Sequence, residues 1–256
     1  MSLIEVKDIA MRFGGLVALG NISLEIKEGE VFSLIGPNGA GKSTLFNCIN
    51  GFYKPQKGSI TFEGKELTRL HPHRISQLGI SRTYQNVELF AGMTTIDNIL
   101  TGRHRLIKNG ILTNAFFGRN QTEELRAKED ALKILDFLGI LSAEEKNVAS
   151  LPYGIRKLVE IGRALASQPK LLLLDEPASG MNDRETAEVA KIIMDIREDL
   201  GITVLLVEHD MNLVMSISDR IYVLNNGQRL AEGKPKEVKG HPKVIEAYLG
   251  KDYKIA

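Results

Sequence analysis

The stretch that decides the fold is LIGPNGAGKST, which occupies positions 34–44. It matches the spacing G-x-x-x-x-G-K-[ST] and lies between a short apolar run, VFSLIG, and a helical pattern from Lys42 to Cys48. Glycines in such a loop let successive backbone N–H groups point at phosphate oxygens, and the positive end of the following helix adds to their field. We therefore expect a phosphate-binding loop. Its expected contacts with a bound nucleotide are Gly36, Pro37, Asn38, Gly39, Ala40, Gly41, Lys42, Ser43 and Thr44.

Other groups are suited to act on a bound phosphate. Lys42 can reach the terminal phosphates, and the Ser43 hydroxyl can hold Mg²⁺. Asp175 ends the apolar run KLLLLD, and the carboxyl ends of such strands open onto the crevice where ligands bind. Asp175 can hold Mg²⁺ directly or through water, and the adjacent Glu176 can polarise a water molecule. An Asp-Glu-Pro turn after a strand is common by itself, but the upstream phosphate loop favours the metal-binding interpretation.

His209 ends a third apolar run, ITVLLVEH. Parallel strands share the edge formed by their carboxyl ends, so we expect His209 to lie on the same rim as Asp175. A lone histidine is more often structural than catalytic, and the sequence indicates no role for the other four histidines. The position of His209 at a strand end is what makes it a candidate.

Composition narrows the class of protein. The chain has 256 residues, of which 43% are hydrophobic and 25% charged, as in an ordinary globular protein. A formal net charge of +1 argues against a surface built for nucleic acid. The single cysteine, Cys48, excludes an internal disulfide. No apolar run reaches the roughly 18 residues of a membrane-spanning helix, so we expect a cytosolic protein unless a partner holds it at a membrane.

Alternation along the chain predicts an α/β fold. SLIEVKDIAMRF and GNISLEIKEGE alternate apolar and polar residues, as half-buried antiparallel strands do, whereas VFSLIG, KLLLLD and ITVLLVEH are typical of buried parallel strands. Asn226-Gly227 lies between two alternating runs and predicts a hairpin. Helices are expected at residues 42–48, 123–138, 158–167, 184–200 and 211–217. The middle of the chain, from about residue 88 to 150, is predominantly helical, and we expect it to form a lobe inserted into an α/β core, with its irregular part at residues 103–120.

Four motifs in order, GPNGAGKST, LPYGIRK, LLLLDEP and LLVEHD, resemble those of the nucleotide-binding subunit of an ABC transporter. The resemblance covers essentially the whole chain. It implies one P-loop domain, with an α/β ATP-binding core at 1–87 and 163–256 and a helical lobe with the signature turn inserted at 88–162. It implies that Gln85 in SRTYQNVELF contacts the metal and senses the transmembrane partner. It also implies that Phe13 stacks on adenine, although an aromatic residue at a strand end is equally often part of the core. SGMND is similar to the loop that crosses to an opposing subunit, with Asn182 where many relatives carry aspartate.

The resemblance also implies a mechanism with ATP and Mg²⁺ as cofactors. Glu176 would be the general base, and His209 would hold the γ-phosphate and the attacking water. Two subunits would face head to tail, with each ATP between one phosphate loop and the other subunit's LPYG turn. Tyr153 and Gly154 still offer N–H groups in that turn, but Pro152 supplies neither the hydroxyl nor the N–H of the usual serine. We expect a weakened but working turn, because proline is tolerated in the first turn of a helix.

A narrower resemblance concerns GFYKPQKGSI, the long segment NILTGRHRLIKNGILTNAFFG and the ending HPKVIEAYLG, which are similar to the ATPases of branched-chain amino acid importers. ATPases of urea or amide importers and of lipopolysaccharide export remain alternatives, and an ABC protein outside transport is a remote one. The implied partners are transmembrane permease subunits, a second ATPase subunit of a different chain or a second copy, and indirectly a solute-binding protein, with no nucleic acid. The implied location is the cytoplasmic face of the cell membrane.

One surface is expected to meet the permease. Gln85 and the following LFAGMTTIDNIL should form a groove that accepts a short helix of the membrane subunit. Phe90, Met93 and Ile96 are the candidate apolar contacts, and their alternative role is local packing of the lobe.

Overall fold

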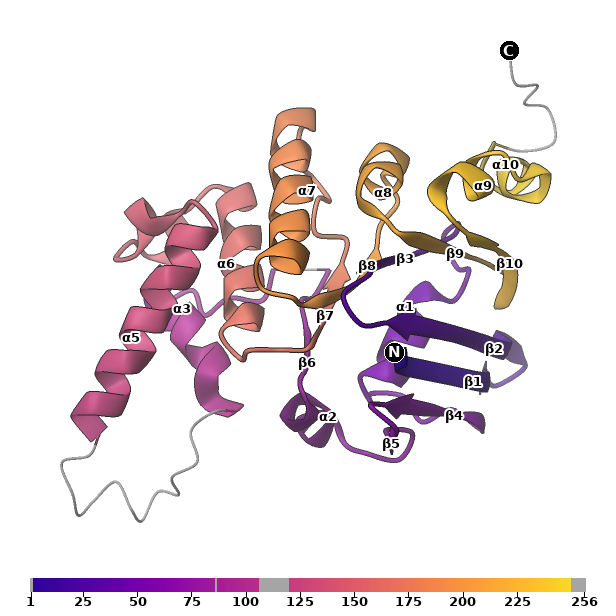
Figure 1. The fold of residues 1–256 in the computed structure, drawn as a ribbon, viewed down its shortest axis with the longest axis horizontal. Coiled ribbons are helices and arrows are strands. Elements are labelled where there is room, and N and C mark those ends of the chain that lie inside the picture. Colours follow the sequence, from indigo (N-terminus) through magenta and orange to yellow (C-terminus); the bar gives the residue numbers. More distant parts are fainter. Residues whose placement is uncertain (1, 86, 106–119, 250–256) are drawn as a thin grey trace.

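The computed structural model describes residues 2–85, 87–105 and 120–249, and within them two β-sheets lie side by side (Figure 1). The antiparallel sheet, in spatial order, consists of β2 (Leu16–Lys27), β1 (Ser2–Phe13), β4 (Lys57–Phe62) and β5 (Lys65–Glu66). The larger sheet consists of β10 (Gln228–Gly233), β9 (Arg220–Asn225), β3 (Val31–Ile35), β8 (Thr203–Val207), β7 (Leu171–Asp175) and β6 (Ile80–Arg82).

The larger sheet is parallel except for its edge strand β10, which pairs with β9 as an antiparallel hairpin. Strands β3, β7 and β8 are buried at every residue. Their sequences are continuous apolar runs because both faces of the sheet are covered. The prediction of a mainly parallel sheet with a small antiparallel portion is confirmed, as is the hairpin at Asn226-Gly227.

Helices cover both faces of the larger sheet (Figure 1). One core combines residues of the two sheets with Leu45, Phe46 and Ile49 of the helix after β3. A second core combines the opposite face with the helical region and the helices after β7 and β8. The helices are α1 (Lys42–Ile49), α2 (Pro72–Leu78), α3 (Thr95–Thr101), α5 (Asn120–Phe137), α6 (Tyr153–Leu165), α7 (Asp183–Glu198), α8 (Met211–Ile217), α9 (Pro235–Lys239) and α10 (Pro242–Leu249), with short 3₁₀ turns η1 (Gly102–Arg105), η2 (Leu141–Ala143) and η3 (Val148–Ser150).

The helical region consists of α3, α5 and α6, at one end of the molecule (Figure 1). The chain passes very close to α6 at Gly102, where a Cβ atom would lie 1.9 Å from the carbonyl oxygen of Arg163. Such a close approach of two backbones requires glycine. The predicted boundary of the lobe at position 162 falls inside α6, and most of RHRLIKNGILTNAFFGRN, the segment at 103–120 expected to be irregular, lies outside the described residues.

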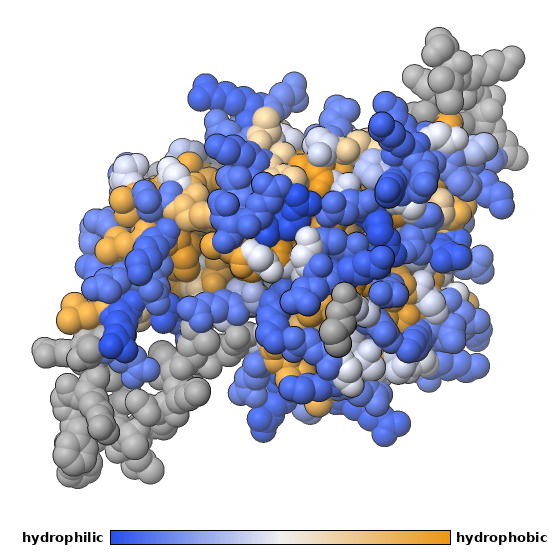
Figure 2. Space-filling view, viewed as in Figure 1, coloured by the Kyte–Doolittle hydropathy of each residue, from blue (hydrophilic) through white to orange (hydrophobic). Residues whose placement is uncertain are grey.

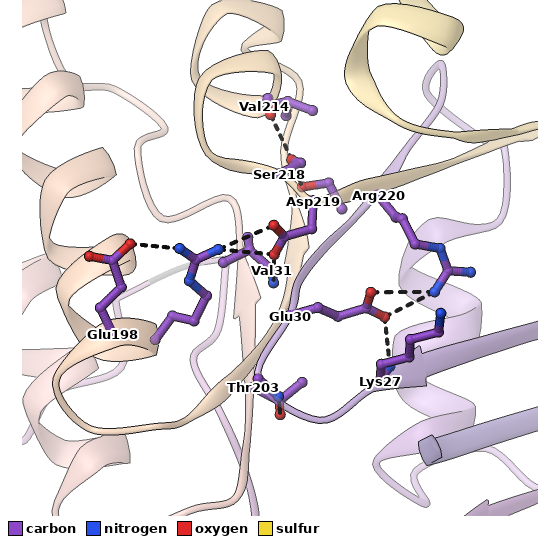
Figure 3. A network of polar contacts seen from close by, with 12 residues as sticks. Lys27, Glu30, Val31, Glu198, Thr203, Val214, Ser218, Asp219 and Arg220 are labelled. Carbon is purple, nitrogen blue, oxygen red and sulfur yellow. Dashed lines mark hydrogen bonds and ion pairs between the residues drawn. The ribbon is translucent and has the colours of Figure 1, made fainter. Parts of the chain in front are cut away.

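A polar network fixes the beginning of β3, at the end opposite the phosphate loop (Figure 3). Asp219 accepts hydrogen bonds from the Val31 N–H at 2.8 Å and from the Arg197 guanidinium at 3.1 Å. Glu30 accepts one from the Lys27 N–H at 2.6 Å and pairs with Arg220 at 3.1 Å. These contacts tie together β2, β3, α7 and β9, so the strand that carries the phosphate loop is held firmly at its far end.

Several elements differ from the prediction. Strand β2 begins at Leu16 rather than Gly20, and helix α6 begins at Tyr153 rather than Leu158. Strands β4, β5 and β6 and helices α2, α9 and α10 were not predicted. Of these, β5 and β6 have only two and three residues and are too short to show a period. Figure 2 shows hydrophilic side chains over most of this face, with hydrophobic residues visible in the region of α5 and α6. In the described ranges, no helix combines the length and the apolar character needed to cross a membrane.

Candidate functional site

The predicted phosphate loop joins β3 to α1, and two of its glycines are required by close contacts. A Cβ atom at Gly36 would lie 2.1 Å from the carbonyl oxygen of Leu224, and one at Gly41 would lie 2.6 Å from that of Ala18. Both glycines also have a positive φ, 156° at Gly36 and 106° at Gly41, which disfavours any other residue. The loop is therefore pressed against β2 and β9, and its shape depends on both sheets.

Lys42 places its ammonium inside this loop. The side chain is 8% exposed, and Nζ donates hydrogen bonds to the carbonyl oxygens of Gly36 at 2.5 Å and Pro37 at 3.2 Å. Burial lowers the pKa of Lys42, while the nearby carboxylates of Glu176 and Asp175 raise it. The cation is thus held by the loop's own carbonyls, close to where phosphate oxygens would enter.

The loop opens into a cavity of about 430 Å³, large enough for a small-molecule ligand. Most of the predicted nucleotide contacts share it, and Gln85 and Glu176 join them from two other segments. Gly36 and Pro37 lie behind Lys42 rather than on the cavity wall. The lining residues are Phe13, Leu16, Val17, Ala18, Asn38, Gly39, Ala40, Gly41, Lys42, Ser43, Thr44, Gln85, Glu176 and Asn226.

Four of these lining residues were missed from the sequence. Leu16, Val17 and Ala18 begin β2, and Asn226 lies in the hairpin turn between β9 and β10. The hairpin reaches the loop because the Gly227 N–H donates to the Ala40 carbonyl at 2.9 Å. The NG turn was visible in the sequence, but its contact with a loop nearly 190 positions away was not.

Phe13 lines the cavity with a partly exposed ring. Its side chain is 43% exposed, which excludes the alternative that it is part of the core. The ring of Tyr53 packs against it edge-on, with centroids 5.2 Å apart and planes at 71°. One edge of Phe13 is thereby supported, and a flat ligand can stack on its face.

Glu176 has a strained backbone. Its φ is 49°, in the left-handed region that a long side chain rarely occupies. The Glu176 N–H donates to the carbonyl oxygen of Val207 at 2.8 Å, which holds this conformation from β8. The carboxylate accepts a hydrogen bond from Gln85 Nε2 at 2.9 Å. Strain of this kind is retained mainly where function requires it, and here it brings two predicted site residues together.

Asp175 is 5% exposed at the end of β7, and it pairs with a residue that the sequence did not reveal. Arg82 Nη2 lies 2.8 Å from Asp175 Oδ2, and Arg82 Nη1 donates to Asn47 at 2.6 Å. Burial raises the pKa of Asp175, and the hydrogen bond and charge of Arg82 lower it. Arg82 also lies over the rings of Phe46 and Tyr84, so it is held from several sides.

His209 is less enclosed than the prediction implied. Strand β8 ends at Val207, two residues earlier, so the prediction that His209 ends the strand is wrong. Its side chain is 62% exposed and does not line the cavity, although Val207 pairs directly with Asp175 across the sheet. The chain leaves the strand early because the buried Glu208 carboxylate accepts hydrogen bonds from the N–H groups of Ala178 and His209, both at 2.9 Å.

The LPYG turn forms the beginning of α6, with Pro152 as its N-cap. The Arg156 N–H donates to the Pro152 carbonyl at 3.1 Å, so the N–H groups that precede it have no intrahelical acceptor. Tyr153 and Gly154 do not line the P-loop cavity. A Cβ at Gly154 would lie 3.2 Å from Glu185 Oε1, in α7.

The SGMND loop leads into that same helix. Asn182 is the N-cap of α7, and its side chain accepts hydrogen bonds from the N–H groups of Arg184 and Glu185. Glu185 in turn accepts one from the Asn182 N–H at 3.0 Å, which completes a capping box. Asparagine therefore has a structural function here, as the cap that fixes the loop against α7.

A second cavity, of about 760 Å³, lies between α2, β6 and α6, beside the predicted permease contacts. Phe90 lines it and is 53% exposed, and Met93 is 40% exposed nearby. Ile96 is 4% exposed, so the prediction that it contacts a partner is wrong. It occupies the first turn of α3 and packs into the core of the helical region. Arg163 Nη1 donates to the Glu88 carbonyl at 2.5 Å and holds one wall of the cavity.

A phosphate loop after β3, with an acidic pair at the end of β7, two strands away in the same parallel sheet, defines a P-loop nucleotide-binding protein. The model of the ABC transporter family matches residues 19–179, more than half of the chain, and the chain belongs to the ABC transporter family. A second model, described as branched-chain amino acid ATP-binding cassette transporter, matches residues 228–254. The predicted resemblance, and with it the prediction of an ABC ATPase, is confirmed.

Individual relatives agree with this assignment. The chain is 46% identical over 252 residues, covering 97% of it and 98% of the relative, to the high-affinity branched-chain amino acid transport ATP-binding protein LivG of Salmonella typhimurium. A crystal structure of a nucleotide-free ATP-binding cassette from an ABC transporter superposes with a TM-score of 0.85 at 35% identity, over 98% of this chain and 100% of that one. A dimeric ATP-binding cassette in a post-hydrolysis state, bound to ADP and Pi, superposes with a TM-score of 0.75 at 26% identity, over 91% and 98%.

Proposed function

We propose that this chain is the ATP-hydrolysing subunit of an importer for branched-chain amino acids. The observation that carries the proposal is the identity of 46% to LivG over nearly the full length of both chains. The match of residues 228–254 to the branched-chain amino acid model supports it independently, because that segment lies outside the part that matches ABC transporters in general.

In this proposal the phosphates of ATP occupy the cavity along residues 38–44, with the Lys42 ammonium on the terminal phosphates. The backbone N–H groups of the loop and the positive end of α1 provide the remaining field. The adenine ring stacks on the exposed face of Phe13, which Tyr53 supports. A cavity that holds both an exposed aromatic ring, Phe13, and a phosphate loop with Lys42 fits a nucleoside triphosphate better than a single phosphate.

The available donors also fit Mg²⁺. Ser43, Gln85 and Asp175 offer hydroxyl, amide and carboxylate oxygens, the ligands that this hard cation prefers. In the part of the chain that the structure describes, no group of three or more His, Cys, Asp or Glu residues could hold a metal by itself. Bound by Ser43, Gln85 and Asp175, Mg²⁺ would neutralise charge on the phosphates.

We assign Glu176 the part of general base. Its carboxylate lies on the cavity, and the strained backbone aims it there. Gln85 holds one carboxylate oxygen at 2.9 Å, so the other can accept a proton from the attacking water. His209, two residues after the end of β8, is exposed, and its Nδ1 lies 3.6 Å from the buried carboxylate of Glu208. It is free to reach the γ-phosphate and the water once these are present.

A second subunit would complete the site. The exposed N–H groups at the start of α6 lie away from this chain's own P-loop cavity, as expected of groups that serve the nucleotide of another subunit. Pro152 cannot donate, so Tyr153 and Gly154 provide the contact. The second subunit is either a different ATPase chain or a second copy. The dimeric relative bound to ADP and Pi supports such an arrangement.

The cavity beside Phe90 is the proposed seat of a short helix from a permease subunit. Its walls come from α2, β6 and α6, and Gln85 lies in the segment after β6, between the lining residues Tyr84 and Glu88. Movement of a docked helix can therefore reach the Gln85–Glu176 contact directly. Held in this way, the chain would lie at the cytoplasmic face of the membrane, and it would meet a solute-binding protein only through the permease.

Copurification and transport test the proposal. The tagged chain is isolated from detergent-solubilised membranes of its host, and the complex is placed in vesicles with its solute-binding protein. We expect integral membrane proteins to copurify, and ATP to drive uptake of labelled leucine, isoleucine or valine. Recovery with ribosomes or DNA would contradict a transport function. Uptake of urea but not of leucine would overturn the choice of solute.

A further inference from the structure

Lys157 is a buried cation at the centre of the site. It is the last residue of LPYGIRK, but the resemblance gives it no role. It lies in the second turn of α6 and is 2% exposed. Its Nζ donates hydrogen bonds to the backbone carbonyl of Gln85 at 2.9 Å and to that of Glu176 at 3.3 Å. These two carbonyls belong to segments that follow different strands, β6 and β7.

A lysine in this position is costly. Removing an ammonium group from water is unfavourable unless charges and hydrogen bonds replace the water, and a leucine or methionine would fill the space without that cost. Burial raises the pKa values of the Glu160 and Asp175 carboxyl groups, and the charge of Lys157 opposes that rise at both of them. Its Nζ lies 5.9 Å from the centre of the Tyr153 ring. Several groups of the site are thus arranged around one ammonium.

The hydrogen bond from Lys157 to the Glu176 carbonyl adds to the bond from the Glu176 N–H to Val207. The Glu176 N–H is held by Val207, and the Glu176 carbonyl is held by Lys157. Both peptide groups that flank the strained Cα are therefore fixed, one from β8 and one from α6. The side chain of Gln85, whose carbonyl is the other acceptor of Lys157, binds the Glu176 carboxylate. The position of α6 thus sets the direction of the carboxylate through two routes.

We propose that Lys157 is a positioning residue that makes the orientation of Glu176 and Gln85 depend on the first turn of α6. The inference rests on the proposed part of Glu176 as general base. The same ammonium lies beside the ring of Tyr153 at the start of α6, whose N–H would face the nucleotide of a second subunit in the proposed dimer. Engagement of the LPYG turn by that nucleotide shifts α6, and Lys157 carries the shift to the base of the chain's own site. Each subunit thereby senses whether the opposite site is filled.

The test is a comparison of steady-state ATPase kinetics and nucleotide affinity for Lys157→Met, Lys157→Arg and Arg156→Met. Methionine keeps the length and packing of the side chain and loses its charge and donors. Arg156 is the matched control, because its guanidinium lies 5.7 Å from the same Tyr153 ring, and no hydrogen bond to Gln85 or Glu176 is found for it within the described residues. Glu176→Gln is measured in the same series.

We expect Lys157→Met to lower kcat by about tenfold or more while the KM and the Kd for ATP change less than about threefold, because the lost contacts do not touch the P-loop. Lys157→Arg should recover most of the activity, and Arg156→Met should keep it. A kcat of Lys157→Met within about threefold of wild type, or an equal loss in Arg156→Met, would overturn the proposal. A loss confined to KM would do the same, because it would place Lys157 in nucleotide binding.

Two further results separate the possible failures. If Lys157→Met melts below the assay temperature, Lys157→Gln replaces it: arginine should then give the higher kcat, and equal kcat values for Arg and Gln would refute the proposal. If Glu176→Gln is inactive while Lys157→Met is fully active, only the positioning role is wrong. If Glu176→Gln keeps its turnover, the assignment of the base is wrong, and the inference about Lys157 is overturned with it.

Discussion

Replacement of Arg82 by methionine should destabilise the nucleotide-free protein strongly. The guanidinium pairs with Asp175 at 2.8 Å, and the two side chains are 9% and 7% exposed, so solvent screens the pair very little. Breaking a buried pair by removing one partner costs about 3–5 kcal/mol, because the other charge is left uncompensated. For a chain of this size about 1 kcal/mol corresponds to 2–4 °C in Tm, so we expect Arg82→Met to lower Tm by about 6–20 °C.

The loss should depend on pH in a defined direction. Burial already raises the pKa of Asp175, and removal of Arg82 takes away a cause that lowers it. An acid whose pKa is raised by folding destabilises the protein where it is ionised, and the penalty disappears below its unfolded pKa. The difference between Arg82→Met and wild type should therefore grow as the pH rises through the folded pKa of Asp175 and shrink towards acid pH.

Urea unfolding of the two proteins at several pH values measures this effect, with Asp175→Asn as the second partner of a double-mutant cycle. Arg184→Met is the control, since its pair with Glu188 is 89% and 61% exposed and an exposed pair of this kind contributes only about 0.3–0.5 kcal/mol. In the Asp175→Asn background, Arg82→Met should cost about 2 kcal/mol less than in wild type. A cost below about 1 kcal/mol at pH 8, or full additivity with Asp175→Asn, would refute the reasoning.

Three other predictions follow from the structure. Phe90→Asp should abolish ATP-driven uptake and leave basal ATPase activity largely intact. The control Leu125→Asp, at an exposed position on α5, should affect neither. A collapsed melting transition of Phe90→Asp would instead show that Phe90 packs within the lobe. Gly154→Asp should block ATP-dependent dimerisation in a Glu176→Gln background, and it should still do so when Glu185→Gln removes the neighbouring carboxylate. Pro152→Ser should strengthen dimerisation in the same background. Normal dimerisation of Gly154→Asp would show that the turn meets no phosphate. Cys48 is 1% exposed, and burial raises its pKa to about 12. At pH 8 it should therefore react with a thiol reagent more than about tenfold slower in the native protein than in the unfolded protein. Because the unfolded thiol ionises at about 9, this group should destabilise the fold progressively from pH 9 to 12, and equal reactivity of native and unfolded protein would contradict its burial.

The sequence revealed the parts of the site that are contiguous. The phosphate loop could be predicted because its spacing, the strand before it and the helix after it lie within a few residues of one another. Asp175 and Glu176 could be predicted because an apolar strand ends at them. In both cases the local pattern contains the physical reason for the geometry that the structure shows.

Contacts between distant segments were invisible for the opposite reason. Arg82 meets Asp175 across 93 positions, and SRTYQ carries no spacing that points to it. Lys157 lies within a recognised motif, but its hydrogen-bond acceptors are backbone carbonyls. Any residue provides a carbonyl, so the sequence could not reveal these contacts. Ile96 was misplaced because the sequence showed apolar residues on a short helix without showing which side of that helix faces the core.

The most direct test of the account is the turnover of Glu176→Gln. Glutamine keeps the shape of the side chain and can still contact Gln85, but it cannot accept a proton from water. We predict that ATP binds with an affinity close to that of wild type, because the P-loop contacts are unchanged, while kcat falls by about 10²- to 10⁴-fold. A kcat within about threefold of wild type at undiminished ATP affinity would contradict the assignment of Glu176 as the general base.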